Sequence, residues 1–162
     1  MRELLTSEVF LTVDERRVRP KSPAELVVGM VRSLGIETDA SGLPVLMTRM
    51  GQTLFDPPNV AGWPGSAWIN SSTLLERINF ANRVATDRKS FNPQADLAKV
   101  GGTSPREIVD YFIDLLLDRN TTPSERQVLY DRARDFLNTG NADAAARAVV
   151  YLVLSSPDYQ LV

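Results

Sequence analysis

The spacing of polar and apolar residues along the chain follows the period of an α-helix. Three segments share one start signal: Ser-Pro-Ala-Glu at 22–25, Ser-Pro-Arg-Glu at 104–107 and Thr-Pro-Ser-Glu at 122–125. In each segment Ser or Thr can cap a helix, Pro fits the first turn, and Glu can reach back to the amide of the capping residue. Apolar residues then recur every three or four positions. The sequence therefore predicts three helices that begin at the prolines of these segments.

The same pattern predicts an all-α fold, an irregular bundle of about six helices with one long ordered loop rich in Pro, Gly and Trp. We expect the helices at 23–34, 44–50, from within 70–73 to 86, and at 105–117, 123–137 and 142–154. The last is apolar on nearly all sides, which predicts a central position. Residues 87–103 are polar with a Gly-Gly pair and predict a loop or a hinge. We therefore expect a single helical domain over 1–162, with a subdivision into 1–86 and 104–162.

One apolar face is predicted for the helix that ends at residue 86. Its members share the helical spacing and are expected on the buried side: Leu74, Leu75, Ile78, Ala81 and Val84. This assignment rests on periodicity alone.

Composition limits the chemistry that the chain can perform. Its 162 residues contain no Cys and no His, which excludes catalytic triads with histidine, cysteine nucleophiles and metal sites with histidine or thiolate ligands. We therefore expect no cofactor and no metal site, and whether the chain is an enzyme stays open. The net charge of −2 gives no field that favours nucleic acid. No apolar run reaches about 18 residues, so we expect no membrane insertion.

Two charged stretches have an ordinary and a functional interpretation. Glu107, Asp110, Asp114 and Asp118 recur on one helix face, where they could attract a cation or a basic partner, although a solvated face is typical of such a pattern. The basic stretch 15–21 could contact phosphate, but it contains no aromatic residue and is flanked by acidic ones. A solvated loop or an ion-pair cluster fits it better.

The stretch Phe-Asp-Pro-Pro-Asn-Val-Ala-Gly-Trp-Pro-Gly at 55–65 is the strongest candidate for a site. Its prolines restrict the backbone and its glycines permit turns. We expect hydrogen bonds from the side chains of Asp56, Asn59 or Asn70 to backbone amides to hold the loop. The candidate binding residues are Asp56, Asn59, Trp63, Trp68 and Asn70.

Three roles remain open for the two tryptophans of this loop. Trp63 and Trp68 could fill a gap between the helices as a structural plug. They could instead anchor a protein partner, because Trp is enriched at binding hot spots. Stacking on a sugar ring is the third role. Burial of the indole rings would distinguish a plug from either kind of binding surface.

The segment from Arg49 to Arg83, which contains the Gly-Trp-Pro-Gly run followed by Trp-Ile-Asn, closely resembles a signature of the bacterial domain-of-unknown-function family 1800. Residues 18–36 and 152–162 are also similar to that family. Usual members are roughly three times as long, and their earlier parts hold Trp- and His-containing motifs. The resemblance implies that this chain is the C-terminal part of such a protein, beginning inside the Arg-Glu-Leu-Leu-Thr region.

The resemblance also implies a cellular context but no reaction. Members of the family are commonly exported bacterial proteins, and their genes are often paired with those of domain-of-unknown-function family 1501 proteins. The leading hypothesis is a non-catalytic helical domain that packs against the remaining N-terminal part of the same protein or against a partner. The alternatives are a fragment of an enzyme whose catalytic residues lie mainly in the missing N-terminal part, and a glycan-binding module that uses Trp63 and Trp68.

Overall fold

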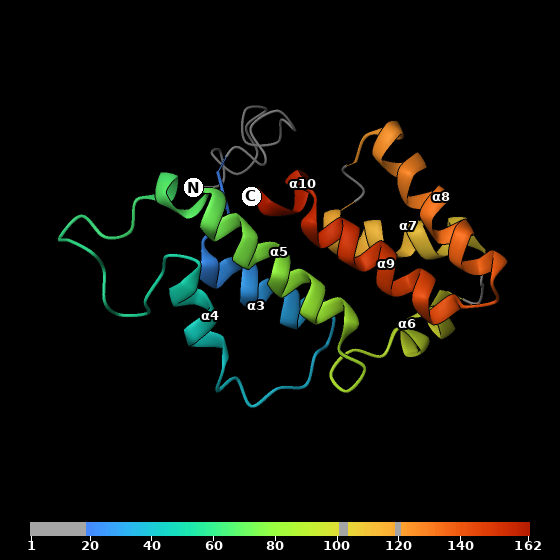
Figure 1. Cartoon of the computed structure of the whole chain (residues 1–162), viewed down its shortest axis with the longest axis horizontal. Coiled ribbons are helices and arrows are strands. Elements are labelled where there is room, and N and C mark those ends of the chain that lie inside the picture. The colour runs from blue at the N-terminus through green and yellow to red at the C-terminus, as the bar shows by residue number, and fades with distance from the viewer. Residues whose placement is uncertain (1–18, 101–103, 119–120) are drawn as a thin grey trace, which may run out of the picture.

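The computed structural model describes residues 19–100, 104–118 and 121–162 of the chain (Figure 1). Within these ranges the fold consists of eight α-helices and one 3₁₀ helix, and it contains no β-strand. In chain order the elements are α3 (Pro23–Ser33), α4 (Leu43–Arg49), the 3₁₀ helix η2 (Gly65–Trp68), α5 (Ser71–Thr86), α6 (Pro93–Val100), α7 (Pro105–Leu117), α8 (Pro123–Asn138), α9 (Ala142–Ser155) and α10 (Pro157–Gln160). The prediction of an all-α fold is confirmed.

All three predicted capping boxes form. The hydroxyl oxygens of Ser22, Ser104 and Thr122 accept hydrogen bonds of 3.2, 3.3 and 3.2 Å from the backbone N–H three residues further on. The Glu carboxylates at those positions accept bonds of 2.7, 3.1 and 2.9 Å in return from the amides of the capping residues. These reciprocal bonds satisfy amides that a helix start leaves unpaired, so the starts of α3, α7 and α8 follow from local sequence.

The first capping box carries an additional ion pair with a pH signature. Arg19 donates to both carboxylate oxygens of Glu25, at 2.7 and 3.1 Å. These hydrogen bonds, helped by those from Ser22, lower the pKa of Glu25 from 4.5 to about 2. Because the unfolded chain takes up this proton first, the stabilisation is fully present above about pH 5 and is lost as the pH falls toward 2. Both side chains are about half exposed, so solvent screening keeps the effect small.

We predict that Glu25→Gln removes this pH-dependent component. Urea unfolding of the native chain and of the variant should differ most near pH 7, and the difference should shrink between pH 5 and pH 2. Arg19→Gln should remove most of the same component, because Arg19 is the main cause of the lowered pKa. A difference in unfolding free energy that stays constant over this pH range would contradict the assignment.

Helix α9 is the centre of the bundle, as its apolar sequence predicted. It packs against α5, α7 and α8, and also against α6 and α10, and Figure 1 shows it running between α5 and the α7–α8 pair. Its buried residues are small or aliphatic: Ala145, Ala146, Val149, Val150, Val153 and Leu154. Small side chains let neighbouring helices approach closely on several sides, so one core cluster joins residues from both halves of the chain.

The prediction of a loop or a hinge over 87–103 is wrong for Pro93–Val100, which form α6, and residues 101–103 lie outside the described residues. Asn92 caps this helix by accepting a bond of 3.1 Å from the Gln94 amide, and Pro93 fills its first position. Phe91 and Leu97 are buried in the core cluster. The polar composition of the segment concealed these two apolar anchors, whose burial depends on packing with α7 and α9.

The predicted buried face of α5 is partly wrong. Ala81 and Val84 are buried, but Leu75 is 58% exposed, and Leu74 and Ile78 are only half-buried. The inward face instead carries Arg77, whose side chain is completely buried. Its guanidinium donates to the Lys21 carbonyl at 2.8 Å and to the Gln160 side chain at 3.2 Å. Those acceptors compensate for the burial of the polar atoms of the guanidinium group.

The two ends of the described chain lie side by side. Arg19 and Val162 exchange backbone hydrogen bonds of 3.2 and 2.8 Å, and the Lys21 amide donates to the Gln160 carbonyl at 2.8 Å. The Lys21 ammonium group lies 3.8 Å above the ring of Tyr159 and donates to the carbonyl of the same residue. Burial raises the pKa of the Tyr159 hydroxyl well above its ordinary value. Part of the basic stretch thus serves internal contacts, while Arg16 and Arg17 lie outside the described residues.

The acidic series on α7 is not simply a solvated face. The Asp110 carboxylate accepts bonds of 2.8 Å from Arg126 and 2.7 Å from the Tyr130 hydroxyl, both on α8. These contacts tie α7 to α8. Among the described residues, no group of three or more Asp or Glu side chains is arranged to hold a metal ion.

Candidate functional site

The long loop between α4 and α5 begins with firm attachments to the helices. Gly51 adopts a φ of +94°, which Gly tolerates and other residues resist. The Gln52 amide donates to the Met47 carbonyl at 2.9 Å, and its side-chain oxygen accepts a bond of 2.9 Å from the Ala24 amide in the first turn of α3. The loop therefore leaves the bundle from a fixed point.

Beyond this point the loop projects from the bundle, as Figure 1 shows at its left edge. Phe55 is 98% exposed and Val60 is fully exposed. Phe55 also has a φ of +63°, an uncommon conformation for a bulky residue. Asn59 forms a turn: its side-chain oxygen accepts a bond of 2.8 Å from the Ala61 amide, and its carbonyl accepts one of 3.0 Å from Gly62.

The loop returns to the bundle at Trp68, which is only 8% exposed. A Cβ added to Gly65 would lie 3.6 Å from the indole ring, and one added to Gly51 would lie 3.9 Å from it. The ring therefore lies against both ends of the loop, where Gly51 and Gly65 bring backbone close to it. The Trp68 carbonyl accepts a bond of 2.9 Å from the Thr73 hydroxyl, while the indole N–H is buried without a partner.

The structure divides the five predicted site residues into two groups. Asp56, Asn59 and the half-buried Trp63 lie on the projecting part of the loop, whereas Trp68 and Asn70 lie at its base. Asn70 caps α5, because its side-chain oxygen accepts bonds of 3.0 Å from the amides of Ser72 and Thr73. The expected hydrogen bonds from loop side chains to backbone amides are confirmed for Asn59 and Asn70.

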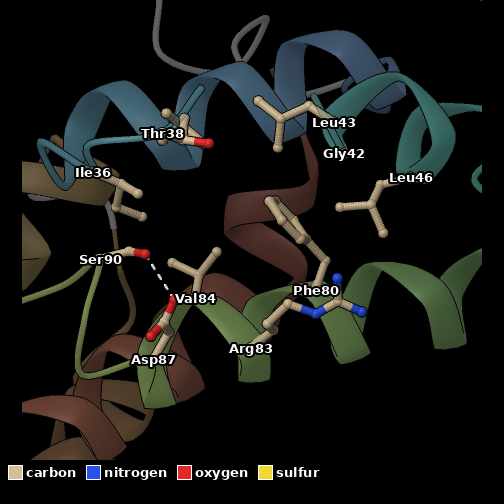
Figure 2. Close-up of a pocket in the computed structure, with 11 residues that line it drawn as sticks. Ile36, Thr38, Gly42, Leu43, Leu46, Phe80, Arg83, Val84, Asp87 and Ser90 are labelled. Atoms are coloured by element: carbon tan, nitrogen blue, oxygen red, sulfur yellow. Dashed lines mark hydrogen bonds between the residues drawn. The ribbon is translucent and has the colours of Figure 1, made fainter. Parts of the chain in front are cut away.

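A cleft that the sequence did not indicate lies between the α3–α4 connection and α5 (Figure 2). It has a volume of about 180 Å³. Its apolar walls come from Val31, Ile36, Leu43, Leu46, Phe80 and Val84, and Thr38, Arg83, Asp87 and Ser90 supply polar groups. These residues come from segments that are distant in sequence, and those within helices carry the ordinary pattern of core positions. No sequence signal marks such a cleft.

Two of the four polar side chains of the cleft, Asp87 and Ser90, are hydrogen-bonded to each other. The Asp87 carboxylate accepts bonds of 2.7 Å from the Ser90 hydroxyl and 2.9 Å from the Lys89 amide. These bonds, that of Ser90 first, lower the pKa of Asp87. Figure 2 shows Asp87 turned toward Ser90 and the Arg83 side chain extending away from it. Within the cleft, the Ser90 hydroxyl is therefore engaged as a donor to the Asp87 carboxylate.

The fold and the loop together define a helical domain from which one loop, anchored at both of its ends, projects. The chain belongs to the family described as "Protein of unknown function (DUF1800)", whose model matches residues 1–161. The identification from the Gly-Trp-Pro-Gly signature is therefore confirmed. No curated protein and no solved structure matches the chain.

No α-helix in the described ranges is both long enough and apolar enough to cross a membrane.

Proposed function

We propose that this chain is a non-catalytic interaction domain whose projecting loop, residues 53–64, binds another protein surface. The observation that carries the proposal is the exposure of Phe55 and Val60 at the projecting part of the loop. An exposed aromatic ring and an exposed β-branched residue contribute nothing to the core of this domain. Aromatic residues, Phe among them, are enriched in the buried cores of protein interfaces.

The backbone of the loop supports the same interpretation. Phe55 holds a positive φ, which costs a bulky residue of the order of 1–3 kcal/mol and is typical of functional segments. Pro57, Pro58 and Pro64 restrict the chain, and the Asn59 turn fixes its far end. A loop that is already ordered loses little conformational entropy when it binds.

A protein partner fits the loop better than a glycan. Stacking of two indole rings on sugars would require both faces to be accessible, but Trp68 is buried between the loop ends. Only Trp63 remains for such a contact, and it is half-buried. The exposed groups on the projecting part are mainly apolar and not the polar set that a sugar's hydroxyls need.

The partner that we propose is the remaining N-terminal part of the same longer protein. A domain-of-unknown-function family 1501 protein is the second candidate partner, and the proposed location of the full protein is outside the cytoplasm. Both follow from the family resemblance. We propose no nucleic-acid partner, because the net charge of the chain is −2.

Substitution of the two exposed loop residues tests the proposal. The double variant Phe55→Ser, Val60→Ser should weaken binding to the N-terminal part by at least about tenfold, or ~1.4 kcal/mol, in titration calorimetry. Its melting temperature should stay close to that of the native chain, since exposed side chains contribute little to stability. The control is Val128→Ser on α8, which removes another exposed valine, on the side of the bundle opposite the loop in Figure 1, and should leave binding unchanged.

Two results would overturn the proposal. One is undiminished affinity of the double variant for a partner that the native chain binds. The other is equal loss of affinity in Val128→Ser, which would point to general surface hydrophobicity. The same titration, repeated with a domain-of-unknown-function family 1501 protein in place of the N-terminal part, distinguishes the two candidate partners.

A further inference from the structure

An apolar groove lies where the two ends of the described chain meet, and its lining residue Ile69 directly follows Trp68 at the base of the projecting loop. It has a volume of about 380 Å³ and is bounded by Pro20, Ile69, Leu74, Ile78, Pro157 and Leu161. Leu74 and Ile78, which the sequence predicted to be buried, are half-buried because they form one wall of this groove. Apolar side chains that line an open groove remain in contact with water, and this exposure is thermodynamically unfavourable.

An occupant with apolar side chains would cover these walls and remove their surface from water. The apolar side chains of a polypeptide segment have this chemistry.

The chain itself supplies a suitable segment directly beside the groove. Pro20, which belongs to the groove wall, is joined to residues 1–18 through Arg19. Six of the ten residues at 4–13 are apolar: Leu4, Leu5, Val9, Phe10, Leu11 and Val13. Four charged residues at 14–17 separate this apolar run from the groove wall. Ten residues span at most about 33–36 Å, so Phe10 is within reach of every groove residue.

We propose that the groove at Pro20, Leu74 and Ile78 is the docking site for this chain's own segment 4–13. The short connection makes the contact intramolecular, with an effective concentration in the millimolar range. A contact whose dissociation constant lies below this concentration is then largely formed. The same docking keeps the hydrophobic run 4–13 from associating with other molecules.

Cross-linking in the full chain tests the proposal, and the absence of native cysteine makes the background clean. The pair Phe10→Cys, Leu74→Cys should form an intramolecular link with a short bis-maleimide. The matched control pair is Phe10→Cys, Leu75→Cys, because Leu75 is the next residue of α5 but is exposed and not part of the groove wall. We expect at least about tenfold faster linking in the Leu74 pair.

A second measurement uses the single variant Leu74→Cys in the full chain. Its rate of reaction with a monofunctional maleimide should rise about tenfold when Val9, Phe10 and Leu11 are all replaced by Ser, because opening of the groove then no longer limits access. The Leu75→Cys rate should not change. Equal linking of both pairs, links only between molecules, or an unchanged Leu74→Cys rate would each overturn the proposal. None of these outcomes depends on the binding of a partner to the projecting loop.

Discussion

Trp68→Ala should lower the free energy of unfolding by about 3–5 kcal/mol, a large fraction of the stability of an ordinary domain. The indole is buried at the base of the loop and lies against Gly51 and Gly65, so its removal leaves a void that two fixed backbone segments cannot fill. The orphaned indole N–H offsets part of this loss, since the native state already carries its cost. Urea unfolding followed by circular dichroism measures the change.

Trp63→Ala is the matched control for this prediction. Trp63 is half-buried on the projecting part of the loop, so we expect a loss below about 1 kcal/mol. This variant also leaves Trp68 as the only tryptophan, and acrylamide should quench its fluorescence weakly. A larger loss of stability from Trp63→Ala than from Trp68→Ala, or strong quenching of Trp68, would show that the base of the loop is not held by this ring.

The contrast between the two tryptophans shows what the sequence could not determine. Both residues lie in the same Gly- and Pro-rich stretch, five positions apart, and local rules treat them alike. Trp68 is buried because Gly51, from the other end of the loop, packs against it. That contact depends on how the loop closes in three dimensions. The sequence therefore predicted the loop and its Asn59 and Asn70 hydrogen bonds, but not which indole anchors it.

The helices divide in the same way between local and tertiary causes. The starts of α3, α7 and α8 were predictable, because a capping box is complete within four residues. Helix α6 has a weaker local signal, with Asn92 as its cap and no Glu three residues later, and it is held by burial of Phe91 and Leu97. The cleft of Figure 2 combines two stretches, 31–46 and 80–90, that are distant in sequence, so no local pattern could have indicated it.

Arg77 is the position where periodicity failed most clearly, and it carries the second large prediction. Its guanidinium is completely buried, its Nε has no partner, and burial lowers its pKa to about 10, so it stays charged at neutral pH. It connects α5 to the Lys21 carbonyl and to Gln160, which belong to opposite ends of the described chain. We infer that the hydrogen bonds of Arg77 hold both ends of the described chain against α5.

Arg77→Ala should destabilise the chain by about 2–5 kcal/mol, because it leaves a cavity and two buried acceptors without donors. Arg77→Met keeps most of the side-chain volume and removes the cost of burying the charge, so its loss should be only about 1–3 kcal/mol. We expect stability to rise from Arg77→Ala to Arg77→Met to the native chain. The difference between the two variants then reports packing, and the difference between the Met variant and the native chain reports the hydrogen bonds. A Met variant more stable than the native chain would show that the charge costs more than its hydrogen bonds contribute.

Hydrogen exchange can locate the effect of Arg77→Met. The Lys21 and Val162 amides, which donate to the Gln160 and Arg19 carbonyls at 2.8 Å, should exchange much faster in the variant. The control is Ile113→Val in the core of α7, which costs about 0.5–1.5 kcal/mol and should not accelerate these two amides selectively. If both variants speed exchange at Lys21 and Val162 equally, Arg77 contributes only to global stability. Selective acceleration would instead identify the buried guanidinium as the link that holds the two ends of the described chain together, and with them the groove wall formed by Pro20 and Leu161.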